Sequence, residues 1–249
     1  MSAPSLASTV GQLVVDRPAR SRVFQHLGID FCCGGKLTLE QAARRRNLEP
    51  NTVLAVLLAA EAAGPGEAAG PDPADLSLAD LCDHIEQAHH AYLKTELPRL
   101  SAMIAKVARV HGARHPWMQQ VHETFEPFAA EMVEHMAKEE EVLFPMVRAM
   151  EAGRTGAAQG AAGGCGGTVG NPIGAMVHEH DAAGVALARM RELTSDFAPP
   201  PDACNTFRAT LDGLAELERD MHLHVHKENN ILFPRALDLE RRHAAPPAV

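Results

Sequence analysis

The sequence has few aromatic residues and no long apolar run. It contains one Trp and one Tyr in 249 residues, so the aromatic stacking platforms of single-strand nucleic-acid binders are not expected. No stretch reaches the about 18 consecutive apolar residues of a membrane-spanning helix. No basic segment followed by an apolar core indicates a secretory signal. We therefore expect a cytoplasmic protein with no membrane partner.

Excess positive charge is also missing. The chain carries 32 acidic and 23 basic residues, a formal net charge of -9. This balance argues against a nucleic-acid partner, because such proteins present a basic face. Five cysteines, an odd number in a chain of this length, do not indicate a disulfide framework. Hydrophobic residues make up 46% and charged residues 22%, which is typical of a folded globular protein.

Two segments rich in small residues divide the chain. Residues 62–73 read AAGPGEAAGPDP and predict a linker, and residues 151–170 predict a flexible Gly/Ala loop. The linker separates a head, residues 1–61, from a body, residues 74–243. The head shows short helical pieces around the segment GIDFCCGGK, whose glycines are incompatible with a helix. Within the head, Thr38 and Gln41 have the spacing of a capping box.

The body has four long segments with helical periodicity. The first begins near Ser77, the second after Pro116 and the fourth after residues 199–202. The third has Asn171 as its predicted N-cap, followed by Pro172, a pairing typical of a helix start. Four helices of this length predict an all-α fold in which a small helical domain precedes an antiparallel four-helix bundle.

Histidine and glutamate occupy core positions of three predicted helices. His135 and Glu139 follow the apolar stripe of the second, His224 and Glu228 that of the fourth, and His180 that of the third. Side chains at i and i+4 share one face. Buried carboxylates need partners, because leaving them unpaired costs several kcal/mol. The residues could pair with each other, but two His-x3-Glu copies facing one core better fit a carboxylate-bridged site for two metals. Nitrogen and oxygen donors favour iron or manganese.

An internal repeat supports this interpretation. HMAKEEEVLFP, residues 135–145, and HVHKENNILFP, residues 224–234, are identical at six of eleven positions. The first body helix should supply a further ligand from among His84, His89 and His90. The periodicity does not separate His89 from His90. His84 faces away from the apolar stripe and is expected to be solvated. Surface or supporting roles are expected for three other histidines off the stripes, namely His178, His222 and His226.

These motifs resemble those of the Repair of Iron Centres family of iron-sulfur cluster repair di-iron proteins. That family joins a short Cys-Cys domain to a hemerythrin-like four-helix bundle. The similarity covers nearly the whole chain, although the loop 151–170 looks longer than the family needs. It rests on Asp30-Phe31-Cys32-Cys33-Gly34-Gly35-Lys36, on His89-His90 before Glu96-Leu97-Pro98, on His135-x3-Glu139 with Leu143-Phe144-Pro145, on Glu179-His180-Asp181, and on His224-x3-Glu228 with Asn229-Asn230.

The resemblance implies two iron ions in a carboxylate-bridged di-iron centre, which can also carry an oxo bridge. It implies terminal ligands at His90, His135, His180 and His224, with bridges from Glu139 and Glu228. Only the resemblance selects His90 over His89. The implied function is the repair of iron-sulfur clusters damaged by nitric oxide or oxidants, by supplying iron or redox chemistry. The alternatives are an enzyme that reduces nitric oxide and a hemerythrin-like oxygen or redox sensor. The implied partners are damaged iron-sulfur proteins and nitric oxide.

Cys32 and Cys33 are adjacent in the glycine-rich loop of the head. A disulfide between neighbours is strained and easily reduced. The flexible glycines would let the pair reach a partner or a metal, and the resemblance favours a functional thiol or iron-transfer pair. The alternative is two unreactive thiols in a turn. Two further cysteines, Cys82 and Cys204, are predicted to pack in the core, and Cys165 has no visible ligand set.

The head is short for a core that folds by itself. We therefore expect it either to pack on the body or to form a homodimer.

Overall fold

The computed structural model describes residues 4–62, 72–154 and 168–244. Regular structure in these residues is helical apart from an isolated bridge between Thr9 and Thr38, so the all-α prediction is confirmed. No helix of this part of the chain is long and apolar enough to cross a membrane. Most of the predicted linker and Gly/Ala loop, and Cys165 with them, lies outside the described residues.

The head contains four short helices around its own apolar core. They are α1 (Val10–Asp16), α2 (Arg20–His26), α3 (Leu39–Arg45) and α4 (Pro50–Ala62). The predicted capping box starts α3. Gln41 donates its backbone N–H to the Thr38 hydroxyl over 3.2 Å, and the Thr38 N–H donates to the Gln41 side chain over 3.1 Å. Phe24, Leu39 and Leu57 are fully buried in this core.

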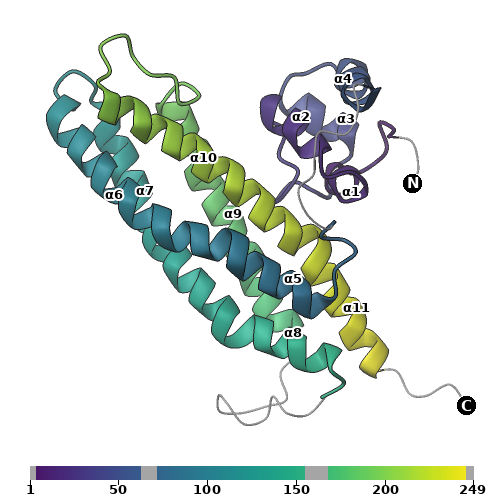
Figure 1. Ribbon diagram of the computed structural model, residues 1–249. Helices are drawn as coiled ribbons and strands as arrows, with labels where there is room; N and C mark the ends of the chain where they lie inside the picture. The colour runs from purple at the N-terminus through teal and green to yellow at the C-terminus, as the bar shows by residue number, and fades with distance from the viewer. Residues whose placement is uncertain (1–3, 63–71, 155–167, 245–249) are drawn as a thin grey trace, which may run out of the picture.

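The body consists of four helical rods that form an elongated bundle (Figure 1). Three rods contain a π-helical turn, labelled η, between two α-helices. The rods are α5 (Leu78–Ile85), η1 (Glu86–His90) and α6 (Ala91–His111); α7 (Trp117–Lys138), η2 (Glu139–Leu143) and α8 (Phe144–Glu151); α9 (Gly170–Leu193); and α10 (Asn205–Lys227), η4 (Glu228–Leu232) and α11 (Phe233–Ala244). Helix α6 packs against α7 and α10, and α9 packs against the same two helices.

The rod ends agree with the sequence in one place and differ in another. Ser77 caps α5, accepting a hydrogen bond from the Asp80 N–H over 3.0 Å as expected. The predicted N-cap at Asn171 is wrong, because α9 begins at Gly170 and its N-cap is Val169. The Val169 N–H donates over 2.6 Å to Glu240 of α11. A side chain from another rod thus satisfies the start of this helix, which local sequence does not reveal.

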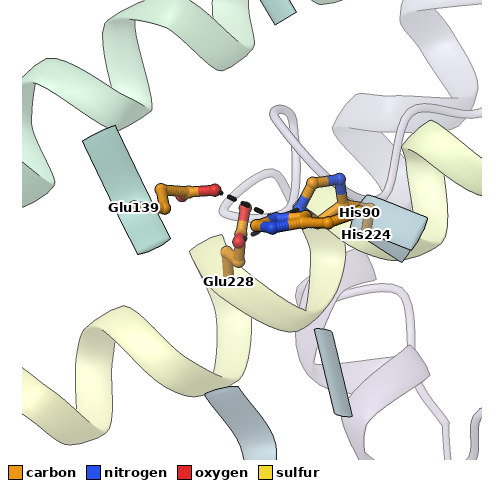
Figure 2. Close-up of side chains that lie close together, drawn as sticks. All are labelled: His90, Glu139, His224 and Glu228. Atoms are coloured by element: carbon orange, nitrogen blue, oxygen red, sulfur yellow. Dashed lines mark hydrogen bonds and ion pairs between the residues drawn. The ribbon is translucent and has the colours of Figure 1, made fainter. Parts of the chain in front are cut away.

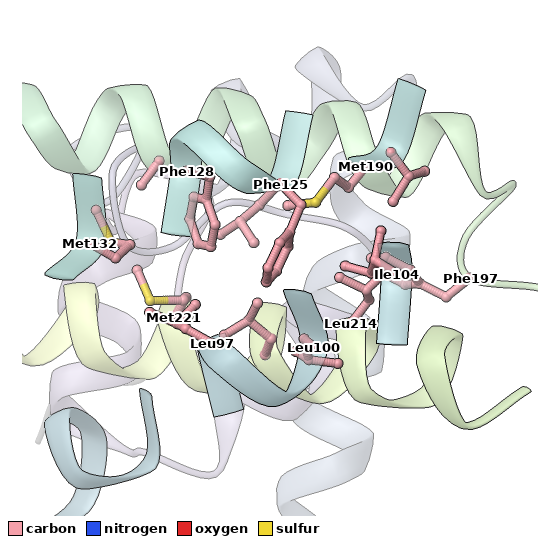
Figure 3. Packing of buried hydrophobic residues seen from close by; sticks show 14 of the residues in the cluster. Leu97, Leu100, Ile104, Phe125, Phe128, Met132, Met190, Phe197, Leu214 and Met221 are labelled. Atoms are coloured by element: carbon pink, nitrogen blue, oxygen red, sulfur yellow. The ribbon is translucent and has the colours of Figure 1, made fainter. Parts of the chain in front are cut away.

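Two apolar layers lie along the bundle, one on each side of the buried histidines and glutamates. The larger contains Phe125, Phe128 and Met221 between α6, α7, α9 and α10 (Figure 3). The smaller contains Phe144 and Leu232 between α5, α8, α9 and α11. Burying each large apolar side chain contributes about 1.5–3 kcal/mol. The polar residues between the layers are therefore fixed in place by well-packed apolar residues above and below them.

The head packs on the body around one asparagine. Asn230 of η4 donates its amide to the carbonyls of Phe31 and Cys32 over 3.4 and 3.2 Å. A Cβ atom on Gly11 or Gly35 would lie 2.4 or 2.3 Å from the Asn230 side-chain oxygen. Glycine at both positions therefore allows this close approach. Of the two arrangements expected for the head, the structure shows packing on the body.

Two side-chain expectations need correction. Cys82 is fully buried as predicted, but Cys204 is exposed at the start of α10, where the periodic pattern has not yet begun. His84 is half-buried rather than solvated, because the Lys227 ammonium bonds to its Nε2 over 2.7 Å.

Candidate metal centre

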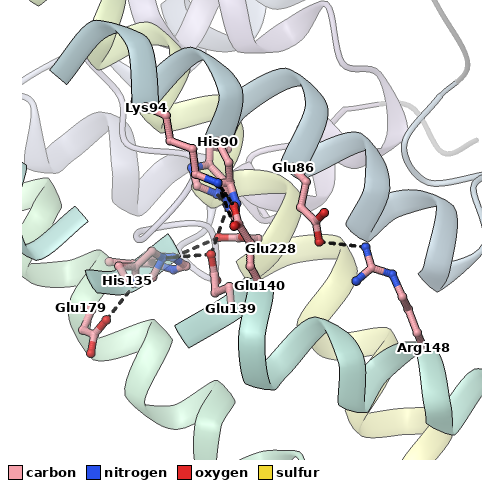
Figure 4. A network of polar contacts seen from close by, with 11 residues as sticks. Glu86, His90, Lys94, His135, Glu139, Glu140, Arg148, Glu179 and Glu228 are labelled. Atoms are coloured by element: carbon pink, nitrogen blue, oxygen red, sulfur yellow. Dashed lines mark hydrogen bonds and ion pairs between the residues drawn. The ribbon is translucent and has the colours of Figure 1, made fainter. Parts of the chain in front are cut away.

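Six polar side chains meet between the two apolar layers. Each is at most 1% exposed, and together they come from all four rods. They are His90, His135, Glu139, His180, His224 and Glu228. All but His180 are labelled in Figures 2 and 4. The i to i+4 spacing of each His-x3-Glu copy places the histidine and the glutamate on one helix face, as the sequence indicates.

The six side chains form two overlapping groups that could each hold a metal ion. Position 1 is defined by His90 and His224, and position 2 by His135 and His180. Both positions share Glu139 and Glu228, and within each group the donor atoms lie within 4.8 Å of one another. At position 1 the two Nε2 atoms are 3.3 Å apart, and at position 2 they are 3.1 Å apart. Two shared carboxylates between two imidazole pairs suit two adjacent cations.

Hydrogen bonds on the far side of three rings support this interpretation. His90 Nδ1 lies 2.8 Å from Glu140, His135 Nδ1 lies 2.9 Å from Glu179, and His180 Nδ1 lies 2.9 Å from Asn229. Because these acceptors favour a proton on Nδ1, the Nε2 atoms present lone pairs toward the shared centre. Lone pairs facing one another at close range repel unless a cation lies between them.

The two shared glutamates test the fit directly. Both oxygens of Glu139 and one oxygen of Glu228 are buried without a hydrogen-bond partner among the described residues. Glu139 Oε2 lies 3.3 Å from His90 Nε2 and 3.4 Å from His135 Nε2, and Glu228 Oε2 lies 3.0 Å from His180 Nε2, so the carboxylates and the imidazoles face one centre. Burial and the neighbouring Glu228 carboxylate raise the pKa of Glu139 well above its usual value. Burial lowers the pKa of His135 and of His224 to about 4, so both rings are neutral, as metal ligation requires. The donor set therefore fits a pair of cations that would neutralise the buried carboxylates.

Lysines at the surface hold two of the supporting carboxylates. Lys94 bonds to Glu140 over 2.7 Å (Figure 4), and Lys138 bonds to Glu179 over 2.6 Å. Sequence periodicity gave no role to Glu140 or Glu179. The signal that could have found them is their place beside a core residue, Glu140 next to Glu139 and Glu179 next to His180.

Each π-helical turn begins or ends at a donor. His90 ends η1, Glu139 begins η2 and Glu228 begins η4. Such turns are rare and often occur at functional sites. Each such turn inserts an extra residue into the helical repeat. This explains why the periodicity of the sequence could not decide which of His89 and His90 faces the core. The structure brings His90 into position 1, whereas His89 contacts Asp220 and Lys227 instead.

Three other histidines lie near the centre but outside the donor set. His178 is exposed, as expected for a surface residue, and His222 is half-buried beside the head. His226 is only 4% exposed, and its ring meets that of Phe31 edge to face. His226 therefore belongs to the contact between head and body and not to the donor set.

The thiol pair of the head lies against the body close to position 2. Cys33 Sγ donates to the His180 carbonyl over 3.5 Å, and Cys32 Sγ donates to Asp30 over 3.2 Å. The hydrogen bond with Cys33 and burial raise the pKa of Cys32 well above its usual value. Asp30, Cys32 and Cys33 form a third group that could hold a metal ion. All three line an open cavity of about 510 Å³ between head and body.

Both parts of the chain match models of known protein families. Residues 82–236 match a family model described as a hemerythrin HHE cation binding domain, and residues 6–61 match one described as a domain of unknown function, DUF542. Since the first match covers more than half of the chain, the body is a hemerythrin-like, cation-binding helical bundle. This agrees with the fold and with the buried donor set.

Relatives along almost the full length identify the family more closely. The chain is 37% identical to the iron-sulfur cluster repair protein YtfE of Musicola paradisiaca, over 92% of this chain and 96% of that protein. It is 36% identical to YtfE of Escherichia coli O157:H7 and 32% identical to ScdA of Staphylococcus haemolyticus, also named iron-sulfur cluster repair proteins, with 92% and 91% of this chain and 96% of each relative covered. The chain belongs to this family of iron-sulfur cluster repair proteins.

Proposed function

We propose that this protein repairs damaged iron-sulfur clusters and that a di-iron centre in the body supports the repair. The observation that carries the proposal is the pair of buried glutamates, Glu139 and Glu228, shared by two imidazole pairs and left with unsatisfied oxygens. The names of the relatives and the cation-binding family model agree with it. The four described cysteines are free thiols, which suits a reducing compartment such as the cytoplasm.

In this proposal Glu139 and Glu228 would be shared by the two irons. His90 and His224 would hold one iron, and His135 and His180 would hold the other. The centre would supply iron or electrons to the cluster under repair. The protein's own contribution is to orient three of the imidazoles through Glu140, Glu179 and Asn229, with Nε2 toward the centre, and to shield the carboxylates from bulk water.

Iron content and Mössbauer spectra test the proposal. Purified protein is measured before and after incubation with a protein whose cluster nitric oxide has damaged. We expect two coupled irons per chain, and either their loss or a change in their oxidation state as the cluster returns. A chain that binds no iron pair, or an iron-loaded chain that restores no cluster, would refute it. Greater iron loss from His89→Ala than from His90→Ala would overturn the choice of His90.

We further propose that Cys32 and Cys33 handle iron or sulfur during repair. The support is their place against the His180 segment, together with Asp30, at a cavity open to a small ligand. Adjacent thiols can grip a soft metal. Replacing both with Ser should leave the Mössbauer spectrum of the body unchanged and reduce cluster restoration several-fold. Full restoration by the double variant would reduce the pair to a turn element.

Reduction of nitric oxide is a second candidate, supported by the number of donors. Each position has two imidazoles and two shared carboxylates, which leaves room on each metal for a small molecule. This activity needs only the body. Nitric oxide consumption that is undiminished in the double-Ser variant, with cluster restoration lost, would separate the two activities. No consumption by the reduced protein would remove this candidate.

A further inference from the structure

The four proposed imidazole ligands are not held in the same way. Three of them have a hydrogen-bond acceptor at Nδ1, as described above. His224 differs, since its Nδ1 is buried with no acceptor among the described residues. When Nε2 of His224 binds a metal, Nδ1 must carry the proton. That N–H then lacks the partner that usually orients a ligating histidine.

A neighbouring ring takes the place of that partner. The His89 ring lies parallel to the His224 ring, with 5.3 Å between centroids and 3° between planes. At position 2 the Phe233 ring also lies parallel to the His180 ring, with 5.9 Å between centroids and 3° between planes. The difference is that His135 and His180 each have, in addition, a direct hydrogen bond at Nδ1.

His89 is itself fixed at both nitrogens. Its Nδ1 lies 2.8 Å from Asp220, and its Nε2 lies 2.6 Å from the Lys227 ammonium, which also bonds to His84 over 2.7 Å. The ammonium can only donate, so Nε2 of His89 accepts and Nδ1 donates to Asp220. With both nitrogens engaged, His89 has no free lone pair for a metal, and its ring is held rigidly against His224.

We propose that the two iron positions are unequal: position 1 releases its iron first, and His89 is the positioning residue that limits this release. The inference rests on the proposed di-iron centre and names which iron is exchangeable. Partners that orient ligating histidines are typically worth about 10- to 100-fold in metal affinity. A stacked ring restrains the orientation of His224 but does not accept its N–H, so position 1 is the weaker one.

The thiol pair lies at the other position. Cys33 contacts the carbonyl of His180, which belongs to position 2. The first release therefore does not depend on the thiols, and the double-Ser variant should show the same early release as the unchanged protein. The thiols then act at a later step, in delivering iron or sulfur to the client.

Partial removal of iron tests the asymmetry in the unchanged, full-length protein. The di-iron form is reduced and treated with one equivalent of bipyridyl per chain, crystallised, and measured by anomalous diffraction at the iron edge. We expect lower iron occupancy at the position between His90 and His224. Equal depletion, or greater depletion between His135 and His180, overturns the inference. Absence of iron from both positions before treatment would instead contradict the proposed di-iron centre.

Matched variants test the role of His89. With His89→Ala, the first phase of iron release to bipyridyl should accelerate about tenfold or more, with the second phase unchanged. His89→Phe keeps a ring beside His224 and should restore most of the slow release. Asn229→Ala, the control at position 2, should accelerate the second phase. Equal acceleration of both phases by His89→Ala, or no rescue by Phe, overturns the positioning role. Near-ultraviolet spectra of the iron centre report the same change independently of release.

Discussion

The head and the metal centre of the body both bury charged side chains, but the two sets differ in their partners. In the head, Arg20 is 6% exposed and fully paired, because Nε bonds to Glu61 over 2.6 Å and Nη1 donates to the Leu13 carbonyl over 2.8 Å. In the metal centre, Glu139 and Glu228 are completely buried and keep oxygens without a hydrogen-bond partner among the described residues. Elsewhere in the body the buried Glu218 is paired, because Arg191 donates to it. A buried charge that is satisfied by the protein stabilises the fold, whereas one left unsatisfied points to a ligand that completes it.

The largest expected effect follows from removing one of the unsatisfied glutamates of the metal centre. Glu139→Ala removes a donor from both positions at once, so metal affinity should fall by more than the about 10- to 100-fold that an outer partner is worth. Iron analysis of the purified variant should show that most of the iron is lost. The metal-free variant should be at least as stable as the metal-free parent, because an unpaired buried carboxylate is gone.

Glu141→Ala is the matched control for this change. Glu141 lies on the same π-helical turn, is exposed, and should keep full iron content. An unchanged iron content and spectrum in Glu139→Ala would show that the bridging assignment is wrong.

Much of the centre could be predicted from the sequence because packing leaves a periodic pattern. His135, Glu139, His224 and Glu228 follow apolar stripes, and the repeat ties the two pairs together. His90 could not be separated from His89, since η1 adds a residue that a 3.6-residue period does not contain. The π-helical turn η2 shifts the buried face of the second helix in the same way: Leu143 is buried, whereas the adjacent Val142 is 48% exposed.

Contacts between distant segments were beyond a single sequence. The close approach of Asn230 to Gly11 and Gly35 joins residues about two hundred positions apart, and only the folded chain brings them together. The capping of α9 by Glu240 has the same origin. The thiol pair was visible as a motif, but its contact with His180 was not, because no local pattern encodes how the head rests on the bundle.

Removal of the head tests whether the body binds iron without it. We propose residues 1–61 and 74–243 as the two domains, with all six candidate donors in the second. The body alone should therefore fold, bind iron with an unchanged Mössbauer spectrum, and restore clusters several-fold more slowly. Its thermal midpoint should fall slightly, because Leu223 loses its packing against the head. A truncated chain that cannot bind iron would contradict this division of labour.

The smallest expected effect follows from removing the paired buried arginine of the head. Arg20→Ala leaves Glu61 and the Leu13 carbonyl without their partner, and hydrogen bonds to charged groups are worth about 1.5–3 kcal/mol. The cost should lie near the lower end, because Glu61 is 19% exposed and also contacts Arg17. Hydrogen exchange should quicken in α2 and α4 of the head and stay unchanged around the metal donors. Arg22→Ala, an exposed change on the same helix, serves as the control. If Arg20→Ala lost iron as readily as Glu139→Ala, the unsatisfied glutamates would have no special role in holding the metal, which would contradict the proposed centre.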